Sequence, residues 1–244
     1  ASTIMNHTPP PREDWASRWF PGLFSYTNPN SFVNKLRGRR MNQLQELLKS
    51  FPSDHGVVRV LDIGGTAGFW KNIGGLPPET HSVMLLNLTK EPLDGSMPNF
   101  TSMAGSALSL PFPDQSFDVV FSNSVIEHVG SRDHQRQMAA EILRVGKRHI
   151  IQTPSYWFPL EPHARLPFFQ FLPRSIRAWL IYHFTINYFP SAPTYRECLT
   201  VSDCTILLTH QHMRELFPAS TIITERLLGL PKSYVAVGGW TSPS

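Results

Sequence analysis

An apolar run that ends in an acid and then breaks into a glycine-containing loop is the part of this sequence best suited to bind a cofactor. The run is Val60-Leu61-Asp62, and Ile63-Gly64-Gly65-Thr66-Ala67-Gly68 follows it. A strand whose last residue is Asp62 holds the carboxylate at the carboxyl edge of a parallel sheet, and glycines let a ligand approach bare backbone. An ordinary buried strand that meets a turn is the alternative. No Gly-Lys-Ser/Thr follows, so a triphosphate site is not indicated.

A second group of residues is suited to acid–base chemistry. Glu161 and His163 lie two apart in the segment Trp157-Phe158-Pro159-Leu160-Glu161-Pro162-His163. An extended backbone between prolines sends both side chains to one side, where the carboxylate can orient the imidazole as a general base. A purely structural contact is the alternative. His128 is another candidate base because it closely follows an apolar strand, unless Glu127-His128 simply begins a helix.

The sequence indicates no metal site. Cys198 and Cys204 have no set of Cys and His partners at zinc-finger spacing, and two cysteines do not make a disulfide framework. His210 and His212 lie in a predicted helix, where a spacing of two directs them to different faces. We therefore expect a chain without a metal, in a reducing compartment.

Size and charge limit the possible functions. The 244 residues, 41% of them hydrophobic, can form one α/β domain with an insertion. No apolar run reaches the roughly 18 residues of a membrane span, and no signal pattern opens the sequence, so we expect a soluble, cytoplasmic protein. The net charge is +4, but basic residues cluster only at Lys35, Arg37, Arg39 and Arg40, which is typical of a solvated helix face. RNA binding is the alternative for this cluster.

Alternating strands and helices must position these residues. Apolar periodicity predicts a helix that begins after Ser31, a short one over 70–73, one over 131–146 and one over 209–217. Strands are predicted near 60–63, 82–88, 101–106, 117–123, 149–153, 221–227 and 233–237. This order indicates a doubly wound α/β fold with a mostly parallel, seven-stranded sheet.

Two segments depart from the alternation. Residues 1–30 are rich in prolines and aromatic residues, so we expect an irregular cap on a domain of residues 31–244. Residues 155–208 interrupt the pattern after the fifth strand and contain one amphipathic helix over 173–184. We expect a substrate lid there, although its apolar stripe could instead contact a membrane surface. The oligomeric state is not predicted.

With these elements placed, the chain resembles the class I S-adenosylmethionine-dependent methyltransferases of the small-molecule, type 11-like family. The resemblance is carried by Asp62-Ile63-Gly64, by Asn87, and by Leu110-Pro111-Phe112-Pro113-Asp114-Gln115-Ser116-Phe117-Asp118, continuing to Val129. It covers residues 44–153 well and 209–238 more loosely. It implies a Rossmann-like methyltransferase fold, S-adenosylmethionine as cofactor, S-adenosylhomocysteine as product, and methyl transfer by in-line displacement.

The resemblance also implies roles for individual residues. Asp62 would hold the amino group of the cofactor's methionine, the backbone of Gly64 and Gly65 would lie against methionine and ribose, and Asn87 would bind the ribose hydroxyls. Adenine would lie near Leu88 and Ala107. The complete expected cofactor set is Asp62, Gly64, Gly65, Thr66, Gly68, Asn87, Leu88, Ser106, Ala107, Asn123 and Ser124.

Three positions depart from the family's pattern. Thr66 replaces a glycine of the Gly-x-Gly-x-Gly loop, Asn87 replaces an acid, and Ser106 stands where many relatives have Asp. A binding protein or a non-methylating enzyme that retains the cofactor pocket is therefore the alternative function. An RNA methyltransferase is a further one.

Methyl transfer from a sulfonium requires an aligned nucleophile and, for a hydroxyl or thiol, a base, but it requires no metal. We expect His163, oriented by Glu161, or else His128 to take the proton. We expect the acceptor pocket to be formed by four residues of the lid, Tyr156, Trp157, Arg165 and Trp179. Arg165 would bind a carboxylate or phosphate of the acceptor, and the other three would offer aromatic surface. The acceptor is expected to be small and apolar or aromatic, and nucleic acid is not expected to bind.

Overall fold

The computed structural model describes residues 46, 56–164, 166–184, 186 and 194–240. The expected cap of residues 1–30, the helix after Ser31 and the basic cluster of residues 35–40 lie outside this part of the chain.

The described residues form one mixed sheet of seven strands in the order β3-β2-β1-β4-β5-β7-β6. The strands are β1 (Val58–Ile63), β2 (His81–Asn87), β3 (Phe100–Ala104), β4 (Val119–Asn123), β5 (His149–Pro154), β6 (Thr221–Leu227) and β7 (Leu230–Gly238). The first five strands run parallel, and β7 lies antiparallel between β5 and β6. The predicted doubly wound, mostly parallel seven-stranded sheet is confirmed. Strands β2 and β3 lie on one side of β1, and β4 lies on the other, so the strand order reverses at this point. The carboxyl ends of β1 and β4 therefore border a crevice suited to a ligand.

Helices follow the strands at short intervals. They are α4 (Ala67–Asn72), α5 (Arg132–Val145), α6 (Arg174–His183), α7 (Tyr195–Ser202) and α8 (His210–Leu216), with single 3-10 turns η1 (Ile126–His128) and η2 (Phe169–Phe171). The side chain of Ser131 caps α5 by accepting a hydrogen bond from the amide of His134, and Gly146 follows its last turn. The predicted helix over residues 173–184 is found as α6. Sequence periodicity did not predict α7, which begins with a capping box of Thr194 and Glu197.

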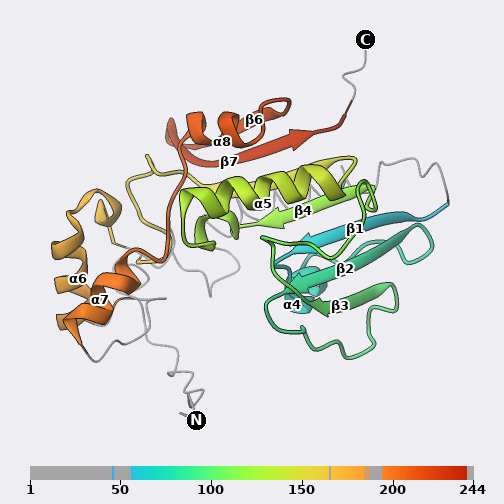
Figure 1. Cartoon of the computed structure of the whole chain (residues 1–244), viewed down its shortest axis with the longest axis horizontal. Coiled ribbons are helices and arrows are strands. Elements are labelled where there is room, and N and C mark those ends of the chain that lie inside the picture. The colour runs from blue at the N-terminus through green and yellow to red at the C-terminus, as the bar shows by residue number, and fades with distance from the viewer. Residues whose placement is uncertain (1–45, 47–55, 165, 185, 187–193, 241–244) are drawn as a thin grey trace.

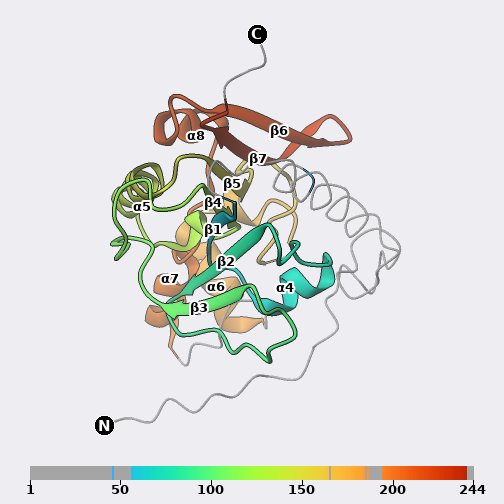
Figure 2. The ribbon, with the colours of Figure 1, turned by 90° about the vertical axis from the view of Figure 1, so that its right-hand side faces the viewer.

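The helices cover both faces of the sheet. Successive side chains of β1 point to opposite faces, so Leu61 packs with Met138 and Ile142 of α5, whereas Val60 packs with Trp70 of α4. Figure 2 shows α5 and α4 on opposite sides of β1. This two-sided cover explains why the parallel strands are continuous apolar runs.

Residues between β5 and α8 build a third, smaller core that includes Ala164, Phe169, Ala178, Ile181 and Cys198. Helices α6 and α7 lie to the side of the sheet toward which β1 points (Figure 1). The segment is thus placed beyond the carboxyl ends of the parallel strands, and its role as a lid stays a prediction. Within the described part of the chain, no helix has the length and apolar character needed to cross a bilayer.

Candidate active site

Asp62 lies inside the molecule, one residue before the end of β1. Its carboxylate is fully buried, and Oδ2 accepts a hydrogen bond of 2.7 Å from Nε1 of Trp70. Oδ1 has no hydrogen-bond partner among the described residues. Burial raises the pKa of Asp62 to about 7, although the bond from Trp70 opposes this. A buried oxygen without a partner is suited to receive a donor from a ligand.

The loop after β1 requires glycine at two positions. Gly64 has φ +81°, and a Cβ there would lie 2.3 Å from Cγ2 of Val125. A Cβ on Gly65 would lie 1.8 Å from Oδ2 of Asp62. Thr66, by contrast, has an ordinary extended backbone and caps α4, its hydroxyl accepting from the amide of Phe69 over 3.2 Å. Threonine at position 66 therefore caps α4, and a ligand can still approach the backbone of Gly64 and Gly65 closely.

Two cavities lie at this edge of the sheet, and Gly64 lines both of them. The smaller has a volume of about 140 Å³, and its lining includes Asp62 and Asn123, each of which has a buried Oδ1 without a partner among the described residues. The larger has a volume of about 490 Å³. It is lined by Ile63, Gly64, Leu86, Asn87, Leu88, Thr89, Gly105, Ser106, Ala107, Leu108, Val125, His128 and Val129.

Most of the expected cofactor residues meet at these cavities. Asn87 donates its amide hydrogen to the carbonyl of Gly65 over 2.8 Å, which leaves its amide oxygen for a ligand. Two expected residues line neither cavity. Gly68 lies in α4, where a Cβ would have no described atom within 4 Å, and Ser124 donates its hydroxyl to Oε1 of Gln152 over 2.9 Å.

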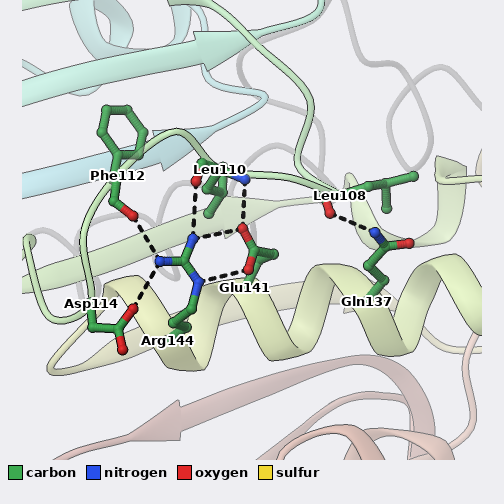
Figure 3. Close-up of polar contacts among 7 residues, drawn as sticks. All are labelled: Leu108, Leu110, Phe112, Asp114, Gln137, Glu141 and Arg144. Atoms are coloured by element: carbon green, nitrogen blue, oxygen red, sulfur yellow. Dashed lines mark hydrogen bonds and ion pairs between the residues drawn. The ribbon is translucent and has the colours of Figure 1, made fainter.

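Arg144 of α5 holds the segment that begins with Leu110 (Figure 3). Its guanidinium donates to the carbonyl oxygens of Leu110 and Phe112 over 2.9 and 2.7 Å, and to Oδ1 of Asp114 over 3.0 Å. Glu141 pairs with the same guanidinium and also accepts from the amide of Leu110 over 2.6 Å. The motif that carried the family resemblance is therefore fastened to α5 by both its amide and its carbonyl groups.

Gln137, one turn before Glu141 on α5, extends this attachment toward the larger cavity. Its amide donates to the carbonyl of Leu108 over 2.8 Å (Figure 3). Ser106 in turn accepts from the amide of Leu108 over 3.2 Å. Because Ser106 and Leu108 line the larger cavity, α5 fixes one of its walls.

Two histidines and two acids meet beside the larger cavity. Nδ1 of His163 and Oε1 of Glu161 lie 2.7 Å apart, so the expected contact is present. The ring of His163 also stands nearly perpendicular to that of His128, with centroids 4.6 Å apart. Glu127, which precedes His128, is fully buried and accepts a hydrogen bond of 2.9 Å from Thr153 at Oε2.

The surroundings give these groups different proton affinities. Burial alone would lower the pKa of His163, but the bond and charge of Glu161 and the charge of Glu127 outweigh it and raise the pKa. Burial and the neighbouring His163 lower the pKa of His128 to about 4. Burial raises the pKa of Glu127 to about 7. Of the two histidines, His163 is thus the better proton acceptor.

A third cavity has a volume of about 520 Å³ and lies between the start of α5 and the segment that carries α6 and α7. It is lined by Gly130, Arg132, Tyr156, Glu161, Phe169, Gln170, Arg177, Ser202, Asp203, Thr205, Ile206 and Leu207. Of the expected acceptor residues, Tyr156 lines it, whereas Trp157 and Trp179 do not and are about half exposed. Arg165 lies outside the described residues.

Several lining residues were not predicted. Arg132 is far in the sequence from Gln170 and Arg177, and the three residues come together only where the segment that carries α6 and α7 meets the start of α5 at this cavity. The sequence suggests Glu127 only as a possible helix start, and no local pattern marks this glutamate as buried.

Comparison with known proteins supports the same cofactor chemistry. Residues 61–149 match the family model described as "Methyltransferase domain", type 11. The solved CurJ carbon methyltransferase has a TM-score of 0.53 at 15% identity, over 85% of this chain and 55% of that chain. The CMeT domain of the citrinin polyketide synthase has a TM-score of 0.52 at 9% identity, over 86% of this chain and 54% of that domain's chain. At these identities the two structures show a shared fold.

A curated relative is the uncharacterized protein Rv1509 of Mycobacterium tuberculosis. It is 36% identical over 56 residues, which make up 23% of this chain and 19% of that protein. The match therefore spans about a fifth of the relative's length.

The donor set fits S-adenosylmethionine. The unpartnered Oδ1 of Asp62 matches an amino group, the bare backbone at Gly64 and Gly65 permits close approach, and the larger cavity has room and apolar walls for an adenosine. The match of residues 61–149 to the type 11 methyltransferase domain, together with the sheet order and this cavity pair, supports a class I S-adenosylmethionine-dependent methyltransferase.

Proposed function

We propose that this enzyme methylates a small acceptor in the 520 Å³ cavity, and that His163, held by Glu161, takes the acceptor's proton. One observation carries the proposal: the Glu161–His163 pair lies between two cavities. Glu161 lines the 520 Å³ cavity, while His163 packs against His128, which lines the larger cofactor cavity. A base at such a border can reach a nucleophile that points toward the cofactor.

The cofactor would lie along the two cavities that share Gly64. The amino group of its methionine would meet Asp62 in the smaller cavity, and its adenosine would fill the larger one, where Asn87, Leu88, Ser106 and Ala107 lie. This arrangement would bring the sulfonium near Gly64. When bound, the cofactor supplies an electrophilic methyl group.

The residues of this chain would then align and deprotonate the acceptor. Because Nδ1 of His163 is engaged by Glu161, Nε2 is the nitrogen free to accept a proton from a hydroxyl. As the proton moves to Nε2, the bond from acceptor oxygen to methyl carbon forms and the carbon–sulfur bond breaks, leaving neutral S-adenosylhomocysteine. The raised pKa of His163 supports its holding the proton.

The lining of the 520 Å³ cavity suggests the class of acceptor. Tyr156 and Phe169 offer aromatic surface. Arg177 pairs with Asp203, whereas Arg132 donates to the neutral oxygens of Gln135 and Leu207 and has no ion pair with a described carboxylate. We therefore favour an aromatic acceptor with a hydroxyl and an anionic substituent that could approach Arg132.

The test is a panel of phenols with and without a carboxylate, assayed with methyl-labelled S-adenosylmethionine. Turnover should favour the carboxylated phenols. His163→Asn should lower kcat by about a hundredfold while the affinity for S-adenosylhomocysteine is kept. His210→Asn, which changes an exposed histidine on α8, is the matched control. An unchanged kcat in His163→Asn would refute the role of the base, and labelled product from none of the phenols would refute this acceptor class.

A further inference from the structure

We propose that Glu127, His128 and His163 bind a divalent transition-metal ion such as Zn²⁺ at the border of the cofactor and acceptor cavities. This site is not expected from the sequence, because His163 lies far along the chain from the other two residues. It keeps the acceptor class of the proposed function but gives the activation of the acceptor to the metal in place of His163. It rests on that function only for the ion's role, not for the binding of the ion.

The geometry of the three side chains is close to that of a coordination site. Each offers one donor atom, and these atoms all lie within 4.8 Å of one another. Tetrahedral ligands at about 2.0–2.2 Å from one zinc ion are about 3.3–3.6 Å apart, so a pair at the full 4.8 Å must close by roughly 1.2–1.5 Å when the ion binds. The side chain of His128 reaches the surface, although part of its ring is enclosed, so it can supply this movement, whereas Glu127 is fixed in the interior.

Glu127 gives an independent reason to expect a cation. Its side chain is fully buried, and Oε1 has no hydrogen-bond partner among the described residues, while Oε2 accepts from Thr153. A buried carboxylate is costly unless it is paired or coordinates a metal. The partner of Oε2 also resembles the outer hydrogen bonds that orient carboxylate ligands.

His163 is prepared in the same way. Glu161 accepts at Oε1 from Nδ1 of His163, and its other oxygen accepts from the amide of Ala164, so the carboxylate is fixed and the ring is oriented. A histidine with Nδ1 bound to a carboxylate presents Nε2 to a metal, as in carboxylate–histidine–zinc arrangements. Two histidines and one glutamate form a donor set typical of catalytic zinc, with a position left open.

The open position would take the acceptor's hydroxyl oxygen. Coordination would promote loss of the hydroxyl proton to solvent, and the coordinated oxygen would then attack the methyl carbon as the carbon–sulfur bond breaks. In the metal-bound enzyme His163 is a ligand, and the metal replaces it in activating the acceptor.

The test is calorimetric titration of the full, metal-stripped chain with ZnCl₂, without cofactor or acceptor, and absorption spectroscopy with Co²⁺. Wild type should bind one ion with high affinity and give Co²⁺ bands of a nitrogen and oxygen site. His128→Asn and Glu127→Gln should each weaken binding by at least about tenfold, and so should Glu161→Gln, which acts through His163. His210→Asn, which changes a histidine outside the cluster, should bind as wild type does.

Absence of saturable binding, or equal binding by wild type and His128→Asn, would overturn the site. If Glu127→Gln does not fold, His128→Asn decides alone, because that side chain is exposed. Failure of the proposed function looks different. If the chain binds Zn²⁺ but methylates no acceptor, the metal site stands and the proposed function is refuted. If the chain does not bind Zn²⁺ and turnover persists with a chelator, the proposed function stands and the metal site is refuted.

Discussion

Nε1 of Trp70 lies 2.7 Å from Oδ2 of Asp62, in a region closed to solvent. The two residues belong to neighbouring elements, β1 and α4, and the glycine loop lies between them. One oxygen of the carboxylate is thereby used within the protein, and the other is left without a partner among the described residues. The indole therefore orients the acid that we expect to hold the cofactor's amino group.

Removal of this hydrogen bond should be costly. Trp70→Phe should lower the free energy of unfolding by about 1–3 kcal/mol for the unpaired oxygen alone, and it should weaken binding of S-adenosylhomocysteine. Urea denaturation and calorimetry measure the two effects. The control is Trp157→Phe, at a side chain that is more than half exposed and should change little. Equal losses in the two variants would show that the bond does not matter.

The buried Asp62 should make stability depend on pH. Its pKa is about 7 in the folded protein, against an ordinary value of 3.8, so the folded state binds more protons between about pH 4 and 7. Its contribution to stability is therefore fully present below pH 4 and is lost as the pH rises through 7. Subtracting the stability profile of Asp62→Asn, in thermal melts without cofactor, isolates this contribution from those of other titrating groups. A difference profile that is flat over this range would contradict the raised pKa.

The same carboxylate should release a proton when the cofactor product binds. An ammonium group beside Asp62 favours the ionised form and lowers its pKa, so affinity for S-adenosylhomocysteine should rise as the pH approaches 7. Calorimetry below pH 7, in buffers of different ionisation enthalpy, measures the release. Asp62→Asn should bind weakly, and its residual affinity should not show this proton release. Tight binding by Asp62→Asn would place the amino group elsewhere.

Gly65 in the loop and Gly68 in α4 should respond oppositely to substitution by alanine. Gly65→Ala should abolish product binding and lower stability, because its Cβ would lie 1.8 Å from Oδ2 of Asp62. Gly68→Ala has open space and lies in α4, so it should be neutral or stabilise the protein by up to about 1 kcal/mol. Thermal melts and calorimetry on the matched pair provide the comparison. Similar behaviour of the two variants would contradict the loop geometry.

The attachment of the Leu110 segment to α5 can be tested at Arg144. Lysine keeps the charge but cannot contact the carbonyls of Leu110 and Phe112, Asp114 and Glu141 at once, so Arg144→Lys should loosen this segment. We expect faster amide exchange over residues 106–114 and several-fold weaker binding of S-adenosylhomocysteine. Arg136→Lys, on the exposed face of the same helix, should exchange as wild type does. Unchanged exchange in Arg144→Lys would mean that the remaining contacts suffice.

Local patterns predicted much of the fold. The apolar runs of β1 and β4, the cap of α5 at Ser131 and the stripe of α6 are properties of neighbouring residues, and each is found in the structure. The Glu161–His163 contact was also predictable, because the two residues are separated by only one. The short α7 was not predicted, because its two turns offer little periodicity.

The site was less accessible to sequence reasoning wherever packing decides. The proximity of His128 and His163 depends on the path of the chain after β5, which no local signal specifies. Aromatic content alone did not separate Tyr156, which lines the 520 Å³ cavity, from Trp157 and Trp179, which do not. Ser124 was expected to bind the cofactor, but its hydroxyl donates to Gln152 and it lines neither of the two cavities that share Gly64.

Asn87, the last residue of β2, ties this strand to the glycine loop. Its amide donates to the carbonyl of Gly65, a bond that an ionised acid at the same position could not form. Asn87→Asp would therefore offer a carboxylate to the ribose and remove this bond to the loop in the same step. Any affinity for the ribose that Asn87→Asp gains is therefore expected to be offset by a less firmly held loop.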